Sequence, residues 1–277
     1  MPTLDRGDGV SIHYEVTGSG PPVLLAMGLA APSIGWYRQV PAFAERYRTI
    51  VFDNRGAGRS SRPRGPYTIR LLADDALAVL DALDVERAHL VGVSMGGMIA
   101  QEVAIERPER VGALVLASTY AAPRVEAEPP RHFVAMQQAF AAGDPLAFTD
   151  AILEATFSPE FLAEPGNREK LLGAFMAASP DGISSAGIFG QLAAAMGHDA
   201  RARLDRIRAP TLVLTGTADG LIAPVCSEEL TEGIAGATLC RITGGSHGVN
   251  AEKPDPWNRH VLGFLAKHDR LLAAGAR

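Results

Sequence analysis

The alternation of short apolar runs with helical stretches constrains the fold of this chain more than any other sequence feature. Helical stretches such as Ile69 to Leu83 and Ser94 to Glu106 separate the runs, most of which are continuously apolar, as in strands buried on both faces. The pattern predicts an α/β fold, in which a mainly parallel sheet is covered by helices on both faces. The predicted strands are Ser11 to Val16, Pro22 to Met27, Thr49 to Asp53, His89 to Val93, Ala113 to Ala117, Thr211 to Thr215 and Thr238 to Ile242.

This alternation stops between about Ala121 and Ala209. The stretch contains helical pieces punctuated by proline and glycine, at Arg131 to Ala142, Pro145 to Ala155, Asn167 to Ala178 and about Ile183 to Met196. A chain of 277 residues is near the upper size for a single core, so an insertion is favoured over a second domain. We predict a core of residues 1–120 and 210–277 and a helical lid of residues 121–209.

Composition excludes several classes of protein. The net charge of −5 without a basic stripe offers no electrostatic footprint for nucleic acid and no attraction to anionic membranes. No apolar run is long enough to span a membrane, and the first residues lack a signal-peptide pattern. Cys226 and Cys240 could pair, but one bridge is no disulfide framework. We expect a cytoplasmic protein; its oligomeric state stays open.

The segment Gly92-Val93-Ser94-Met95-Gly96 matches G-x-S-x-G. It follows a predicted strand and opens a predicted helix, which is the setting that a nucleophile elbow requires. Such a turn holds the serine in a strained backbone conformation and leaves no room for side chains two residues before and after it. Ser94 is therefore the candidate nucleophile; the alternative is a glycine-rich turn without chemistry.

A serine hydroxyl needs a base, and His247 is the best placed histidine. It lies just after the last predicted strand, and loops at the carboxyl ends of parallel strands form the ligand crevice of such sheets. A plain loop histidine is the alternative. For the remaining histidines a surface or packing role is favoured: His13, His89, His132, His198, His260 and His268.

Asp219 is the candidate acid that orients the base. It follows the strand Thr211 to Thr215, and it completes the chain order serine, acid, histidine that is typical of this arrangement. A turn-forming aspartate is the alternative. The other strand end where an acid could stand offers only Ser118, Thr119 and Tyr120.

A tetrahedral intermediate also needs donors for its oxyanion. We expect the backbone N–H groups of Met95 and Leu29 to supply them. Gly28 would let the backbone approach the substrate, although a simple strand-to-loop glycine is the alternative. No cluster of histidine or cysteine has the spacing of metal ligands, so neither a metal nor a cofactor is expected.

Taken together, these residues resemble the α/β-hydrolase family, in its branch of small esterases, enol-lactonases, methylesterases and cofactor-free haloperoxidases with a helical lid. The resemblance implies a mostly structural role for the D-x-R-G-x-G-x-S segment, which is Asp53 to Ser60 in this chain. Many relatives have His-Gly where this chain has Met27-Gly28. A serine nucleophile argues against the dehalogenase and epoxide-hydrolase branches. The residues that carry the resemblance are Gly28, Trp36, Asp53 to Ser60, the elbow, Gly216 to Pro224 and Ser246 to Gly248.

The resulting expectation is a serine hydrolase that cleaves a small, uncharged carboxylic ester or lactone through an acyl-enzyme. The stretch Gly173 to Gly197 contains one charged residue, Asp181, and no basic residue to pair with a charged substrate. Two alternatives stay open: carbon–carbon bond hydrolysis, or perhydrolase or haloperoxidase-like activity, on the same triad. A non-catalytic ligand-binding member of the fold is less favoured, because every triad residue type is present.

Overall fold

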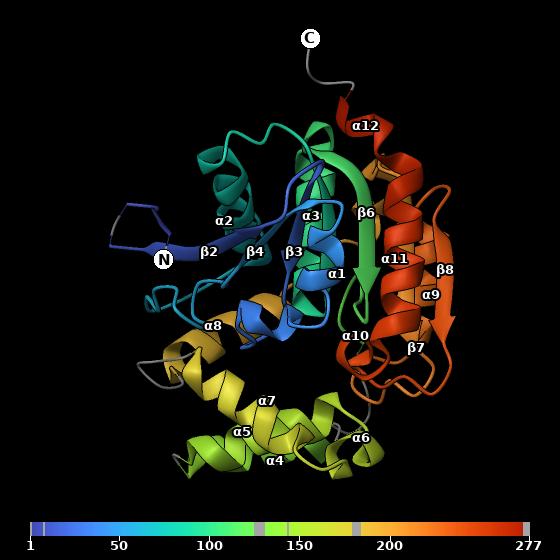
Figure 1. Cartoon of the computed structure of the whole chain (residues 1–277). Coiled ribbons are helices and arrows are strands. Elements are labelled where there is room, and N and C mark those ends of the chain that lie inside the picture. Colours follow the sequence, from blue (N-terminus) through green and yellow to red (C-terminus); the bar gives the residue numbers. More distant parts are fainter. Residues whose placement is uncertain (1, 8, 125–130, 143, 179–183, 274–277) are drawn as a thin grey trace.

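The structure is a computed structural model that describes residues 2–7, 9–124, 131–142, 144–178 and 184–273. In this part of the chain one eight-stranded sheet has the order β1-β2-β4-β3-β5-β6-β7-β8 (Figure 1). Strands β3 to β8 run parallel, and β1 and β2 add an antiparallel edge. The strands are β1 (Thr3–Asp5), β2 (Ser11–Thr17), β3 (Pro22–Ala26), β4 (Arg48–Phe52), β5 (Ala88–Val93), β6 (Val111–Ala117), β7 (Thr211–Gly216) and β8 (Thr238–Ile242).

All seven predicted strands are present, with ends that differ from the predicted ones by at most two residues. Strand β1 is not among the predicted strands, because three residues are too few to show a periodic pattern and two of them are exposed. Helices cover both faces of the sheet, so the predicted α/β fold class is confirmed.

One face of the sheet packs on α2, α3 and α9, and the other on α1 and α11. Helix α2 begins where the Thr68 side chain accepts a hydrogen bond from the N–H of Leu71, as a good N-cap does. On the opposite face Trp36 and Trp257 are fully buried, with ring centroids 5.9 Å apart. These elements are η1 (Ser33–Trp36), α1 (Val40–Ala44), α2 (Ile69–Ala82), α3 (Met95–Glu106), η2 (Pro108–Arg110), α9 (Val225–Gly233), α10 (Val249–Glu252), α11 (Pro254–His268) and α12 (Arg270–Ala273).

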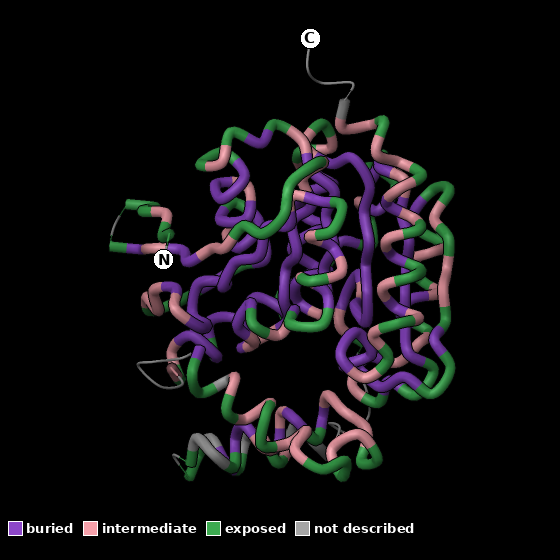
Figure 2. Tube along the Cα trace, viewed as in Figure 1, coloured by how far each residue is buried: buried purple, intermediate pink, exposed green. Residues whose placement is uncertain are grey.

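Between β6 and β7 the chain forms helices α4 to α8, which we call the helical segment. Figure 1 shows it beyond the carboxyl ends of the parallel strands, and Figure 2 shows that it is more exposed than the core. Its helices are α4 (Arg131–Ala141), α5 (Pro145–Thr156), α6 (Pro159–Ala163), α7 (Asn167–Ala177) and α8 (Ser185–Met196), and η3 (Arg201–Arg206) follows them. The predicted start of the last piece, about Ile183, lies outside the described residues. The division into core and lid stays a prediction.

Sequence analysis missed α6. Its cap is visible in hindsight: the Ser158 side chain accepts a hydrogen bond from the N–H of Phe161, and Pro159 stands at the first helical position. Among the described residues, no helix combines the length and apolar character needed to cross a bilayer. No disulfide bond joins Cys226 to Cys240.

Candidate active site

Ser94 stands at a sharp turn between β5 and α3. Its φ of +56° and ψ of −124° are rare for a residue with a side chain, as predicted for an elbow. A Cβ on Gly92 would lie 2.2 Å from the Gly96 oxygen, and one on Gly96 only 2.0 Å from the Ala26 oxygen. The Thr119 hydroxyl donates to the carbonyl of Ser94 at 2.8 Å. The turn therefore tolerates only glycine at both flanks, and the surrounding strands hold the strained serine in place.

His247 and Asp219 meet at the carboxyl ends of β8 and β7. The Nδ1 atom of His247 is 3.0 Å from Oδ2 and 3.2 Å from Oδ1 of Asp219. Oδ1 also accepts hydrogen bonds from the N–H groups of Leu221 and Ile222, at 3.0 and 2.9 Å. The carboxylate fixes the imidazole so that Nε2 is the nitrogen left for proton transfer.

The environment keeps Asp219 ionised. Burial by itself would raise the pKa of its carboxyl, but His247 and the two backbone N–H groups outweigh burial and lower the pKa. An ionised, buried carboxylate is what an imidazolium formed during catalysis needs beside it.

Ser94, Asp219 and His247 follow parallel strands, so the sheet brings all three to one edge. No hydrogen bond joins the Ser94 hydroxyl to His247 in the described part of the chain. Such bonds are often long in a free enzyme and tighten once substrate is bound.

The loop after β3 lies against Ser94. A Cβ on Gly28 would be 3.1 Å from Cβ and 3.6 Å from Oγ of Ser94. Among the described residues, the N–H groups of Leu29 and Met95 donate to no acceptor. Those of Ala30 and Ala31 already donate hydrogen bonds, to Gln191 and Gly28. Two free backbone donors beside a candidate nucleophile are what an oxyanion hole requires.

Two residues that follow β4 hold both ends of the loop Gly28 to Ala31, which we call the oxyanion loop after its expected role. The Asn54 side chain donates to the carbonyl of Met27 at 3.0 Å, just before the loop. Just after it, the N–H of Ser33 donates to the buried carboxylate of Asp53 at 2.6 Å. Residues of the D-x-R-G-x-G-x-S segment thus fix where the loop begins and ends.

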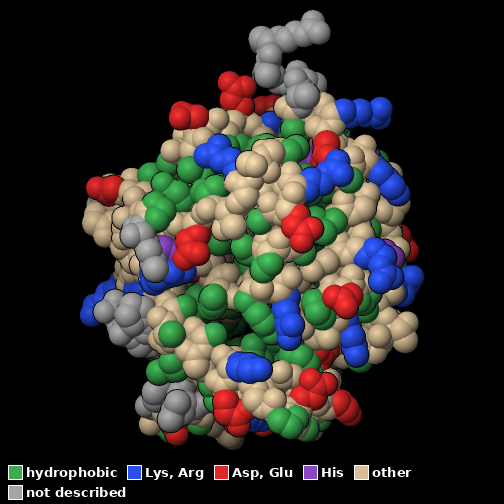
Figure 3. All heavy atoms as spheres, viewed as in Figure 1, with side chains coloured by type: hydrophobic (Ala, Val, Ile, Leu, Met, Phe, Trp, Pro, Cys, Tyr) green, Lys and Arg blue, Asp and Glu red, His purple; other side chains and the backbone are tan. Residues whose placement is uncertain are grey.

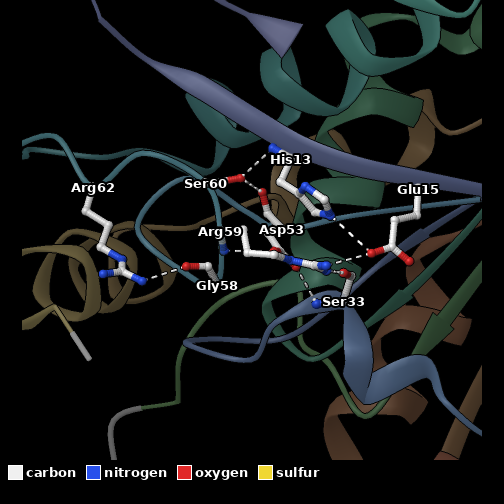
Figure 4. Close-up of polar contacts among 8 residues, drawn as sticks. All are labelled: His13, Glu15, Ser33, Asp53, Gly58, Arg59, Ser60 and Arg62. Carbon is white, nitrogen blue, oxygen red and sulfur yellow. Dashed lines mark hydrogen bonds and ion pairs between the residues drawn. The ribbon is translucent and has the colours of Figure 1, made fainter. Parts of the chain in front are cut away.

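Figure 4 shows the rest of this polar network. The Arg59 side chain donates to Asp53 at 3.2 Å and to Glu15 at 2.7 Å, and a Cβ on Gly58 would lie 2.4 Å from Asp53. The Ser60 hydroxyl donates to the Asp53 carbonyl at 2.6 Å. The polar side chains of this segment form hydrogen bonds within it and with neighbouring parts of the core, which fits the structural role implied by the resemblance.

Residues 21–254 match a family described as the alpha/beta hydrolase fold. The chain belongs to the α/β-hydrolase family. A relative from Azorhizobium caulinodans, named as a proposed carbamate hydrolase, RutD, is 33% identical over 98% of this chain and 100% of its own. A 3-oxoadipate enol-lactonase 2 from Acinetobacter baylyi is 32% identical over 96% of each chain. The crystal structure of an enol-lactonase from Burkholderia xenovorans LB400 has a TM-score of 0.84 at 28% identity, covering 96% of this chain and 100% of that one.

In this hydrolase the loop that carries His247 is joined to the helical segment. The carbonyl of Thr156, at the end of α5, accepts hydrogen bonds from the N–H of Gly248 at 2.6 Å and from the hydroxyl of Ser246 at 2.9 Å. The Glu252 carboxylate accepts from the N–H of Ser158 at 2.6 Å and from that of Ser246 at 2.8 Å. Glu252 therefore connects the helical segment to the residue before the candidate base.

Partial burial of Glu252 favours the neutral acid, but its hydrogen bonds to Ser158 and Ser246 outweigh burial and lower the pKa of the carboxyl. Sequence analysis missed this residue and the anchoring Thr119. A glutamate in a short helix and a threonine after a strand match no motif, and their partners are set by the fold.

Replacing Glu252 with alanine should lower both stability and turnover of the hydrolase. Two backbone N–H groups lose their acceptor, at a cost of about 2 kcal/mol, and the loop of His247 is freed to move. We expect a Tm several degrees lower, by the usual size scaling, and a kcat reduced about tenfold. Thermal unfolding and steady-state kinetics measure both effects.

The matched control is Glu232→Ala, which removes an exposed glutamate from α9. It should leave Tm and kcat near those of the wild type. Equal behaviour of the two variants would show that Glu252 does not hold the loop.

Proposed function

We propose that this α/β-hydrolase is a serine hydrolase that cleaves a small, uncharged carboxylic ester or lactone through an acyl-enzyme. The observation that carries the proposal is the combination of the strained Ser94 with two free backbone donors and a histidine held by a buried carboxylate. Each of these features suits acyl transfer, and a structural turn needs none of them.

In the proposed reaction the Ser94 hydroxyl attacks the carbonyl carbon while Nε2 of His247 takes its proton. The oxyanion that forms is bound by the N–H groups of Leu29 and Met95, each donor contributing about 3 kcal/mol to the transition state. Collapse breaks the bond to the leaving oxygen, which receives the proton from His247. Water, activated by the same imidazole, then attacks the acyl-enzyme, and the acid is released as Ser94 regains its proton.

Several observations favour an uncharged substrate. Ala30 of the oxyanion loop packs in an apolar cluster with Ala139, Phe148 and Ile188 of the helical segment. Figure 3 shows a hollow between this segment and the core, bordered by hydrophobic side chains, with Lys or Arg side chains farther out on the surface around it. Two arginines of the segment after β4 are already paired, Arg55 with Asp75 and Arg59 with Asp53. Asp181, the charged residue singled out in the sequence, lies outside the described residues.

A carbamate is a second candidate substrate, favoured by the identity to the Azorhizobium caulinodans relative named for that activity. The same attack on a carbonyl would apply, with a nitrogen or oxygen leaving group. Direct comparison of esters, lactones and carbamates decides which the hydrolase prefers, and product analysis separates hydrolysis from peracid formation and carbon–carbon cleavage.

Neutral substrates should be preferred over carboxylated ones of similar size. With methyl pentanoate and monomethyl succinate we expect kcat/KM to be at least about tenfold higher for the neutral ester, because a buried carboxylate without a counter-ion is costly. A neutral lactone should be cleaved as well. A clear preference for monomethyl succinate would mean that the site holds a cation, and an acid-bearing enol-lactone would then become the leading substrate.

A further inference from the structure

Gln191 lies in the helical segment and is hydrogen-bonded at both ends of its amide. Its side chain is fully buried in α8, a helix otherwise built of small and apolar residues apart from Ser185. Oε1 accepts from the N–H of Ala30 at 2.6 Å, and Nε2 donates to the carbonyl of Arg55 at 2.8 Å. A buried side-chain amide whose oxygen and nitrogen both form hydrogen bonds holds its partners in fixed positions.

What it binds is the middle of the oxyanion loop. Residues Gly28 to Ala31 form a turn closed by the hydrogen bond from Ala31 N–H to Gly28 O at 3.3 Å. Ala30, the third residue, has φ of +59°, in the left-handed region that costs a residue with a side chain about 1–2 kcal/mol. The bond to Gln191 holds the peptide between Leu29 and Ala30 in the orientation that this conformation needs.

This turn also fixes the position of the N–H of Leu29, the proposed oxyanion donor. The Gly28 carbonyl and the N–H of Leu29 belong to one peptide plane, and Gly28 itself lies against Ser94. If the central peptide were free to flip and relieve the strain at Ala30, the turn would lose its single conformation, and the N–H of Leu29 in the adjoining peptide would be held less firmly in position. Asn54 and Asp53 hold only the ends of the loop, so neither prevents that flip.

The other partner of Gln191 is rigid. The Arg55 guanidinium is bound to the buried carboxylate of Asp75 in α2, with N–O distances of 2.5 and 2.7 Å. Next to it the backbones of Gly56 and Gly187 touch, and a Cβ on Gly187 would lie 2.2 Å from the Gly56 oxygen. Gln191 is thus fixed against the core at one end and holds Ala30 at the other.

We propose that Gln191 is a positioning residue for the oxyanion hole, so that the helical segment takes part in transition-state stabilisation as well as covering the site. The proposal rests on the proposed serine-hydrolase function. The hydrogen bonds of Gln191 go to Ala30 and Arg55 and not to Ser94, so it acts through the turn that positions the N–H of Leu29.

The test begins with Gln191→Met, which keeps the length of the side chain but removes its acceptor and donor. For a neutral ester we expect kcat to fall about 10- to 100-fold while KM changes by less than about threefold, because the oxyanion exists only in the transition state. The inhibition constant of phenylboronic acid, whose adduct with Ser94 is tetrahedral, should rise by a factor similar to the loss in kcat. Titration with a fluorophosphonate counts the folded active sites, so that kcat is given per site.

Tyr120→Phe is the matched control. The Tyr120 hydroxyl donates to the carbonyl of Ala195 at 3.0 Å and so holds the same helix to the core by a hydrogen bond that does not involve the oxyanion loop. Its kcat should stay within about twofold of the wild type. An equal loss of kcat in Tyr120→Phe and Gln191→Met would overturn the proposal, since general loosening of α8 would then explain both.

Gln191→Glu isolates the contact to Ala30. A glutamate oxygen accepts from the N–H of Ala30 whether or not the carboxyl is protonated, so this variant should retain clearly more kcat than Gln191→Met. Equal impairment of the two would contradict the proposed route through Ala30. Wild-type activity that disappears in Ser94→Ala supports the serine-hydrolase function regardless of these results, so the two proposals fail separately.

Discussion

Replacing Ser94 with alanine should remove nearly all hydrolysis while leaving the fold intact. The hydroxyl is the proposed attacking group, and loss of such a nucleophile costs about 10⁴- to 10⁶-fold in kcat. Alanine adopts the same positive φ as serine at comparable cost, so Tm should change little. Hydrolysis of a short p-nitrophenyl ester and thermal unfolding measure the two properties.

The control is Ser185→Ala, which removes an exposed serine from the first turn of α8. It should behave as the wild type, and a fluorophosphonate should label it but not Ser94→Ala. If Ser94→Ala retained a tenth or so of the wild-type kcat, a role as nucleophile would be untenable.

Loss of the base should be as severe as loss of the nucleophile. His247→Ala should match Ser94→Ala, because the two act as a unit. Asp219→Asn should cost about 10⁴-fold in kcat, since the imidazole stays but loses the carboxylate that selects its tautomer and stabilises its charge. The imidazole of His247 can accept the proton of Ser94 only in its neutral form.

His260→Ala, which removes an exposed histidine from α11, is the control and should leave kcat unchanged. A metal chelator should have no effect, because the proposed reaction uses only protein groups. Full activity of His247→Ala, or its recovery on adding a divalent metal, would point to a different chemistry.

The α/β fold was predictable because its signals are local. Strands buried on both faces are continuous apolar runs, and five of them were recognisable without any partner. The elbow was predictable because its G-x-S-x-G pattern spans only five residues. Gly92 is required by the backbone of Gly96 and Gly97, whereas Gly96 is required by the backbone of Ala26 in the neighbouring strand β3. Short elements such as β1 and α6 were not predicted, because they are too short to show a repeating pattern of apolar residues.

The sequence by itself determined which residues follow which strands, and therefore that Ser94, Asp219, His247 and the loop at Gly28 reach one edge of the sheet. Only the tertiary structure decided which groups hold them. The N–H of Leu29 is left free and that of Ala30 is taken because Gln191, 161 residues away, reaches the loop. Glu252 likewise joins its own loop to Ser158, 94 residues away. A hydrogen bond depends on distance and direction between two groups, and no pattern along the chain records either one.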